Sequence, residues 1–138
     1  MKKFRSTFLL ATLLVFVVAL GPTRAHCAEK SGGGENSVGV EKTLHAMIKA
    51  LVADNYAAFL LPGTPELSKN ISEQRFALIR ENVVPDLKDG YTVALDVQVP
   101  EADGSVSFHW MIKSRKSGSE LHAILVIKGE KASDFSLQ

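Results

Sequence analysis

The stretch YTVALDVQVPEADGSVSFHWMIKS, residues 91–114, decides the class of fold. Apolar side chains recur at every second position on both sides of EADG, residues 101–104. A period of two puts alternate side chains on opposite faces of a β-strand, and a short polar segment containing glycine between two such runs is typical of a hairpin turn. These residues therefore predict two antiparallel strands joined at 101–104.

The register of this hairpin predicts one apolar face. If the residues that flank the turn face each other, Leu95 lies opposite Trp110. Val97 and Val99 then share the face of Trp110, and we expect the helices to pack there. His109 points to the other face, because neighbours along a strand alternate. His109 and Trp110 are therefore not expected to form one compact site.

The opposite face of this hairpin carries both polar and apolar side chains, and we call it the mixed face. It holds the only plausible acid–base pair. The same register places Asp96 opposite His109. A carboxylate at this distance orients an imidazole and raises its pKa, as in many general bases. A solvated ion pair on an exposed sheet face is the alternative interpretation. Asp96 and His109 are thus the candidate catalytic pair of an isomerase- or hydratase-type enzyme.

The remaining strands follow directly. Residues 120–129, ELHAILVIKG, are apolar on both parities, as expected of a more buried strand. Residues 133–137, SDFSL, predict a short last strand. The C-terminal half of the chain is therefore expected to be an antiparallel meander of about four strands.

Two helical segments precede the strands. Residues 40–59 carry apolar side chains at helical spacing, with a break at Asp54–Asn55. Ser72 is a good N-cap for a second helix reaching Leu87, whose last turn is weakened by Pro85. The order predicts an α+β fold, with N-terminal helices packed on a curved antiparallel sheet.

The N-terminus is typical of a secretory signal peptide. The basic start MKKFR precedes a 13-residue run with no charged side chain, residues 8–20, which is short of the roughly 20 residues that span a bilayer. We expect cleavage near residue 28, after Ala25, Cys27 or Ala28, leaving no stable membrane span. An uncleaved anchor and a lipidated Cys27 are less consistent with the short run and with TRAH before Cys27. The sequence thus predicts export to the periplasm or the extracellular space.

The mature chain is a small, slightly acidic domain. Removing residues 1–28 takes away four basic residues and no acidic one, which leaves 12 basic and 15 acidic residues and a net charge of −3. Nucleic acid is therefore not an expected partner. Residues 29–37, EKSGGGENS, predict a flexible leader, and residues 38–138 a single domain. The single cysteine excludes an internal disulfide.

Three segments carry a resemblance to a known family. ALVADNYAAFL (50–60), NISEQRFALIRENVVPDLKDGYTV (70–93) and FHWMIKS (108–114) resemble the helix ends and the aromatic strand of the nuclear transport factor 2-like superfamily. The resemblance covers residues 38–138 and is greatest to small exported bacterial domains of uncharacterised function. It implies a cone-shaped, cystatin-like fold with sites on the enclosed side. That superfamily includes isomerases, dehydratases, epoxide hydrolases and binding modules, so the fold does not choose the function.

Aromatic residues are the candidates for a binding pocket. Tyr56, Phe59, Phe108 and Trp110 are expected either to fill the core or to line an apolar pocket at the open end of the cone. A small apolar ligand or a protein partner would occupy such a pocket.

The mixed face of the sheet offers a second use. Met111, Ile124 and Val126 share this face if the second hairpin keeps an odd register sum. Apolar residues on both faces of a sheet indicate that another chain covers one of them. The sequence therefore predicts a homodimer formed through the sheet.

An exported, non-catalytic domain that binds a small ligand or a partner protein is the leading functional prediction. The enzyme described above and a self-associating envelope component are the alternatives. Almost no polar side chain is aimed into the apolar face, which favours binding over catalysis. No cofactor motif is present, and His45, His109 and His122 lack the spacing of a metal site.

Overall fold

The computed structural model describes residues 35–138, with side chains from residue 37 onward. The predicted signal peptide, 1–28, and its possible cleavage sites lie outside the described residues, as does most of the predicted leader. The helices are α1 (Glu35–Val52), α2 (Tyr56–Leu60), α3 (Pro65–Asn70) and α4 (Glu73–Leu87), and the strands are β1 (Tyr91–Pro100), β2 (Val106–Ser114), β3 (Glu120–Lys128) and β4 (Lys131–Leu137).

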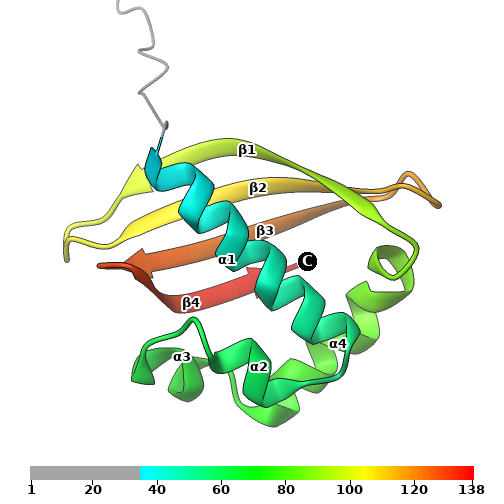
Figure 1. The fold of residues 1–138 in the computed structure, drawn as a ribbon, viewed down its shortest axis with the longest axis horizontal. Helices are drawn as coiled ribbons and strands as arrows, with labels where there is room; N and C mark the ends of the chain where they lie inside the picture. Colours follow the sequence, from blue (N-terminus) through cyan, green and yellow to red (C-terminus); the bar gives the residue numbers. More distant parts are fainter. Residues whose placement is uncertain (1–34) are drawn as a thin grey trace, which may run out of the picture. The chain divides into compact units, whose positions relative to one another are not determined.

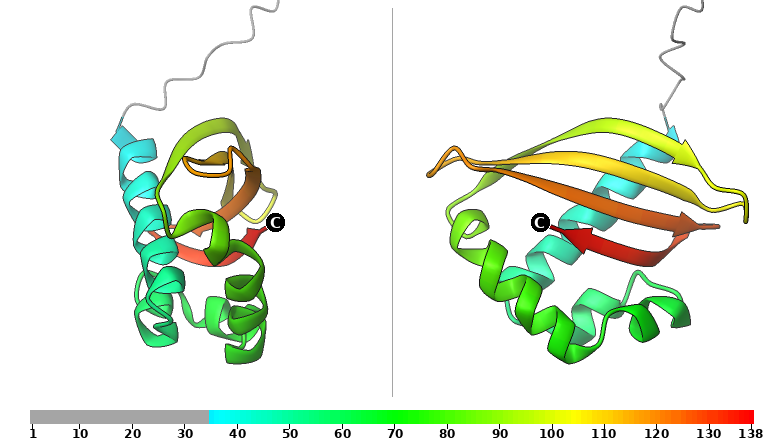
Figure 2. Two further views of the ribbon diagram at one scale, coloured as in Figure 1. Left: turned by 90° about the vertical axis from the view of Figure 1, so that its right-hand side faces the viewer. Right: turned by 180° about the vertical axis from the view of Figure 1, so that it is seen from behind.

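The predicted α+β class is confirmed. The four strands form one antiparallel sheet in the order β1-β2-β3-β4, as a simple meander (Figure 1). Helix α1 lies across one face of this sheet, and α2, α3 and α4 continue beyond the β4 edge (Figure 2). The opposite face carries no helix among the described residues. None of the described helices is long and apolar enough to cross a membrane.

Helix α1 extends further toward the N-terminus than predicted. It begins at Glu35, so the last residues of the predicted leader are helical. The break predicted at Asp54–Asn55 is confirmed, because Asp54 adopts a φ of 55° and Asn55 Oδ1 accepts a hydrogen bond from the Ala58 amide at 2.9 Å. A side-chain cap of this kind satisfies an otherwise unpaired amide at a helix start. The apolar stripe of α1 is buried: Leu44, Met47, Ile48 and Leu51.

The start of α4 is also as predicted. Ser72 Oγ accepts a hydrogen bond from the Arg75 amide at 3.2 Å. The helix continues through Pro85, which is exposed in the last turn, where only one backbone hydrogen bond is lost. The short helix α3 was not predicted from the sequence. Pro65 begins it, in the first helical position that proline tolerates well.

The register of the first hairpin differs from the prediction because β1 contains a bulge. Leu95 pairs with Trp110 as expected, but the ladder shifts between Leu95 and Val97, and Asp96 is the extra residue. Beyond the bulge Val97 lies opposite His109. The alternation predicted for a regular strand is therefore inverted over the last residues of β1. The predicted odd register of the second hairpin is confirmed, since Met111 pairs with His122.

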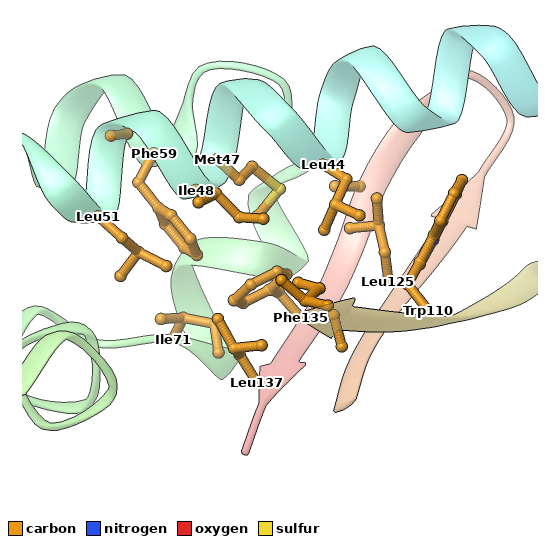
Figure 3. Close-up of a cluster of buried hydrophobic side chains, with 14 of the residues drawn as sticks. Leu44, Met47, Ile48, Leu51, Phe59, Ile71, Trp110, Leu125, Phe135 and Leu137 are labelled. Atoms are coloured by element: carbon orange, nitrogen blue, oxygen red, sulfur yellow. The ribbon is translucent and has the colours of Figure 1, made fainter. Parts of the chain in front are cut away.

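The core lies between α1 and the covered face of the sheet. Figure 3 shows the stripe of α1 facing Phe135 and Leu137 of β4, with Leu125 and Trp110 beside Leu44. Phe59 of α2 contacts both Phe76 and Phe135 edge-on, with ring centroids 5.2 and 5.3 Å apart. Edge-to-face pairs of this kind add to the free energy of area burial. Aromatic side chains therefore fill the core beneath the C-terminal half of α1.

The two edge strands of the sheet differ in their backbone hydrogen bonds. At the β4 edge, the Thr64 amide donates to the Ala132 carbonyl at 2.7 Å, and the Ala132 amide donates to the Pro62 carbonyl at 3.0 Å. The segment between α2 and α3 thus pairs with the beginning of this edge strand, at Ala132. At the other edge, β1 pairs only with β2 among the described residues. Unpaired strand edges are where additional strands can attach.

Candidate functional site

A cavity of about 440 Å³ lies where the first turns of α1 approach the ends of two hairpins. We call it the hairpin-end cavity. Its volume falls in the range of sites that hold small molecules, roughly 300–1,000 Å³. It is lined by Gly39, Val40, Thr43, Gln98, Gly104, Val106, Phe108, Ile127, Gly129 and Glu130.

Three glycines, one in α1 and two in the hairpin turns, add no side chain to the lining of this cavity. A Cβ atom added to Gly39, Gly104 or Gly129 would meet nothing within 4 Å. Gly104 and Gly129 have φ angles of +83° and +67°, which their turns require and which glycine adopts without a steric cost. The turn geometry that closes the two hairpins therefore also removes side chains from the cavity wall.

The wall nearest the core is apolar. Phe108 and Ile127 come from β2 and β3, and Val40 from α1. All three side chains are buried. Phe108 stands between the cavity and Trp110, since these are successive inward residues of the same strand. The cavity thus offers an apolar floor to a ligand.

Gln98 reaches this wall because of the bulge at Asp96. It lies opposite Phe108 and lines the cavity. Without the register shift it would have been placed on the other face, and the sequence-based register missed it for that reason. No pattern in the alternation of β1 marks the bulge. A charged residue, Asp96, within an apolar run is the only sequence signal for it.

Two further polar residues line the cavity. Thr43 Oγ1 donates a hydrogen bond to the Gly39 carbonyl at 3.2 Å, one turn earlier in α1. Glu130 lies in the exposed turn between β3 and β4 and is the only ionisable side chain among the lining residues. With Gln98, these groups give the cavity hydrogen-bonding capacity beside its apolar residues.

The β1–β2 turn beside the cavity is ordered by its own hydrogen bonds. Asp103 Oδ1 accepts from the Ser105 hydroxyl at 2.5 Å and from the Ser105 amide at 3.0 Å. These bonds hold the pKa of Asp103 below its ordinary value, and the bond from the Ser105 hydroxyl has the larger effect. Ser107 Oγ donates to Glu101 Oε1 at 2.7 Å. The turn therefore presents two carboxylates in fixed places.

The predicted pocket residues divide between the cavity and the core. Phe108 lines the hairpin-end cavity. Phe59 and Trp110 are buried in the core, and the indole Nε1 of Trp110 has no hydrogen-bond partner among the described residues. Tyr56 donates its hydroxyl hydrogen to the Ile71 carbonyl at 2.6 Å and lines a separate, more open groove next to α4. The structure does not bring these four residues into one pocket.

The predicted catalytic geometry is wrong. Val97, not Asp96, lies opposite His109, because Asp96 occupies the bulge. Neither Asp96 nor His109 lines the hairpin-end cavity. The acid–base arrangement expected across the strands is therefore not formed.

The bulge also changes the uncovered side of the sheet, which we call the outer face. Val97 and Val99 lie there with exposed fractions of 44% and 37%, although the sequence placed them against the helices. Met111, Ile124 and Val126 are half-buried and share this face, as their register requires. The outer face is therefore more apolar than predicted.

One histidine forms a small polar cluster away from the cavity. His45 Nδ1 lies 2.9 Å from the Tyr91 hydroxyl, and its Nε2 lies 3.6 Å from Glu41 Oε1. Partial burial raises the pKa of Tyr91 above its ordinary value. The described residues contain no group of three or more His, Cys, Asp or Glu side chains arranged to hold a metal ion. His45 thus links α1 to the start of β1.

Comparisons with known proteins leave the family open. No protein-family model matches the chain. A search of curated proteins likewise finds no match. The resemblance to the nuclear transport factor 2-like superfamily, with its cone shape, therefore stays a prediction.

Proposed function

We propose that this protein is an exported, non-catalytic domain that binds a small amphipathic molecule in the hairpin-end cavity. The single observation that carries the proposal is an open cavity of about 440 Å³ whose lining combines apolar side chains with Gln98, Thr43 and Glu130. Small-molecule sites commonly combine an apolar lining with a few polar groups that orient the ligand.

The composition of the lining favours binding over catalysis. General acid–base chemistry needs a titratable group within hydrogen-bond reach of the reacting atoms. Glu130 is the only such group in the lining, and it lies in an exposed turn. The alternative enzyme, which would use Asp96 and His109, loses the cross-strand pairing on which it was based.

Gly39 allows the cavity to be filled without disturbing the core. Its Cβ position is empty, and any other residue except proline is a better helix former than glycine. Gly39→Phe is expected to abolish binding of 1-octanol, used as an amphipathic probe, and Val106→Phe adds bulk from the sheet side. Val38→Phe is the matched control, because Val38 is the preceding, exposed residue of α1 and does not line the cavity.

Backbone amide resonances of the glycines report binding directly. Titration with 1-octanol should shift the signals of Gly39, Gly104 and Gly129, which line the cavity. Those of Gly63 and Gly118 should stay in place, because neither lines it. Shifts that persist in both filled variants, or no shift in the native protein, would contradict the proposal.

Export and family membership belong to the same proposal. They rest on the basic start, the 13-residue run without charge, and the order of helices and strands. Mass spectrometry of the protein secreted by a bacterial host would distinguish cleavage after Ala25, Cys27 or Ala28. A mass corresponding to the full 138 residues would contradict export with cleavage.

The outer face supports a second proposal, self-association of the domain. Its apolar residues Val97, Ile124 and Met111 occupy adjacent strands, and no helix among the described residues covers them. Apolar patches of this kind often mark interaction sites. Association through this face would take one of three forms: a homodimer, a complex with a partner protein, or an envelope assembly.

Sedimentation tests the homodimer. A homodimer is expected at high micromolar concentration and should dissociate in Ile124→Lys, whose charge would be buried at the interface. Leu78→Lys is the control, because Leu78 is exposed on α4, away from the sheet. A native protein that sediments as a monomer at that concentration would rule out the homodimer.

A further inference from the structure

We infer that the hairpin-end cavity selects a cationic amphiphile, a molecule with an apolar body and an amine or other cationic head. This inference rests on the proposed binding function and specifies its ligand. Charge is the property that decides between ligand classes of similar size, because the apolar floor accepts any alkyl or aryl body equally.

The charge of the lining is of one sign. Glu130 is its only charged residue, and no lysine, arginine or histidine lines the cavity. Its position in the β3–β4 turn places the carboxylate at the mouth, whereas Phe108 and Val40 form the floor. A ligand whose body rests on Phe108 would therefore bring its head close to Glu130.

The neighbouring β1–β2 turn adds no charged side chain to the lining. Glu101 and Asp103 lie in the β1–β2 turn, which contributes Gly104 to the cavity. Lys128 lies 3.8 Å from Asp103 and partly offsets that carboxylate. Ser107 alternates with the cavity-lining Phe108 along β2, so its hydrogen bond holds the Glu101 carboxylate on the outer face, away from the cavity. An anionic head at the mouth would therefore face the Glu130 carboxylate, without a cation in the lining to receive it.

Hydrogen bonding favours the same ligand. The side-chain carbonyl of Gln98, the hydroxyl of Thr43 and the carboxylate of Glu130 all accept hydrogen bonds. An ammonium group offers three donors and no acceptor, which matches this set. A carboxylate or phosphate head offers only acceptors and would be left without partners except the Gln98 amide and the Thr43 hydroxyl.

Three probes with the same eight-carbon tail test the inference at neutral pH: octylamine, 1-octanol and octanoate. Their dissociation constants are obtained from the glycine amide shifts described above. We expect octylamine to bind about threefold more tightly than 1-octanol, because an exposed ion pair is worth less than about 1 kcal/mol, and octanoate to bind most weakly. Added salt should reduce the advantage of octylamine and leave 1-octanol unchanged.

Glu130→Gln isolates the charge. It should bring the affinity for octylamine down to that for 1-octanol, while 1-octanol binds as before. Glu81→Gln is the matched control, because Glu81 is an exposed carboxylate on α4 that does not line the cavity. Both substitutions keep the side-chain shape and the fold.

The outcomes separate this inference from the proposed function. If 1-octanol binds and octylamine binds no more tightly, the cationic preference is overturned while the binding function stands. If octanoate binds best, the charge argument is also overturned. If none of the three probes shifts Gly39, Gly104 or Gly129, the binding function itself fails.

Discussion

The two halves of α1 lie over the same face of the same sheet, but one half covers a filled core and the other covers an open cavity. Beneath Met47 and Leu51, the space is filled by aromatic side chains such as Phe59. Beneath Gly39 and Val40, about 440 Å³ stays open. We call these the filled half and the hollow half.

The difference arises from the partners rather than from the helix. The filled half faces α2, α4 and β4, whose side chains include three phenylalanines in edge-on contact. The hollow half faces two hairpin turns, in which positive φ angles call for glycine at Gly104 and Gly129. A hairpin end thus supplies backbone but little side-chain volume, and this leaves a cavity where the helix passes over it.

Matched removals of a phenylalanine test this comparison with the largest expected effect. Phe59→Ala should lower the free energy of unfolding by about 3–5 kcal/mol, since the ring is fully enclosed. Phe108→Ala should cost about 1–2 kcal/mol less, because one side of this ring already faces open space. Chemical denaturation of both variants measures the difference. Equal costs would mean that the hollow half is as tightly packed as the filled half.

Matched additions to glycine give the next largest effect. Gly63→Ala should destabilise by about 1–3 kcal/mol, because the new Cβ would collide with Cδ2 of the fully buried Leu67 and lie 3.1 Å from the Leu60 carbonyl oxygen. Gly39→Ala should stabilise by about 0.5–1 kcal/mol, because its Cβ meets nothing and alanine favours the helix. Thermal unfolding of the two variants should therefore move in opposite directions.

The boundary between the halves is marked by His45 and Tyr91, and its effect depends on pH. Tyr91→Phe should cost about 1 kcal/mol by removing the hydroxyl next to His45 Nδ1. Burial raises the folded-state pKa of Tyr91 above 10.0, so its contribution is present below pH 10 and is lost as the pH rises through the folded-state pKa.

Unfolding of native protein and variant from pH 8 to 11 checks this sign. The native protein should lose stability more steeply above pH 10 than Tyr91→Phe. A variant that follows the native curve would show that Tyr91 does not titrate as inferred.

The smallest effect concerns the turn beside the hollow half. Ser105→Ala should raise the pKa of Asp103 toward its ordinary value of 3.8, because the hydroxyl that lowers it most is removed. The small stabilisation from this carboxylate is present above that value and is lost as the pH falls through the folded-state pKa. NMR titration of the Asp103 carboxyl carbon measures the shift. An unchanged pKa would mean that the turn does not depend on this bond.

Much of the framework was predictable from local chemistry. The break at Asp54–Asn55, the cap at Ser72 and the turn at 101–104 each follow from residues a few positions apart. Periodicity alone distinguished helices from strands and gave the α+β class, because apolar spacing reflects which side chains must be buried. Trp110 was expected in the core or in a pocket wall, and it is in the core.

Register was predictable only up to the bulge. Leu95 pairs with Trp110 as the alternation requires, but one extra residue, Asp96, inverts everything after it. The bulge places Val97 on the outer face, and the predicted register therefore did not identify Gln98 as a residue of the candidate site. A bulge is set by the fit of two strands to each other and to the layer they cover, which no single strand encodes.

By itself, the sequence determined the kinds of elements, their order and most of the core, since these depend on local propensity and on the burial of apolar side chains. The tertiary structure alone decided where space remains. A cavity is the volume that packed side chains leave unfilled, and here it depends on Gly39 of α1 meeting the turns of Gly104 and Gly129, residues 65 or more positions further along the chain. No local pattern links such distant positions, because only the folding of the sheet under the helix brings them together.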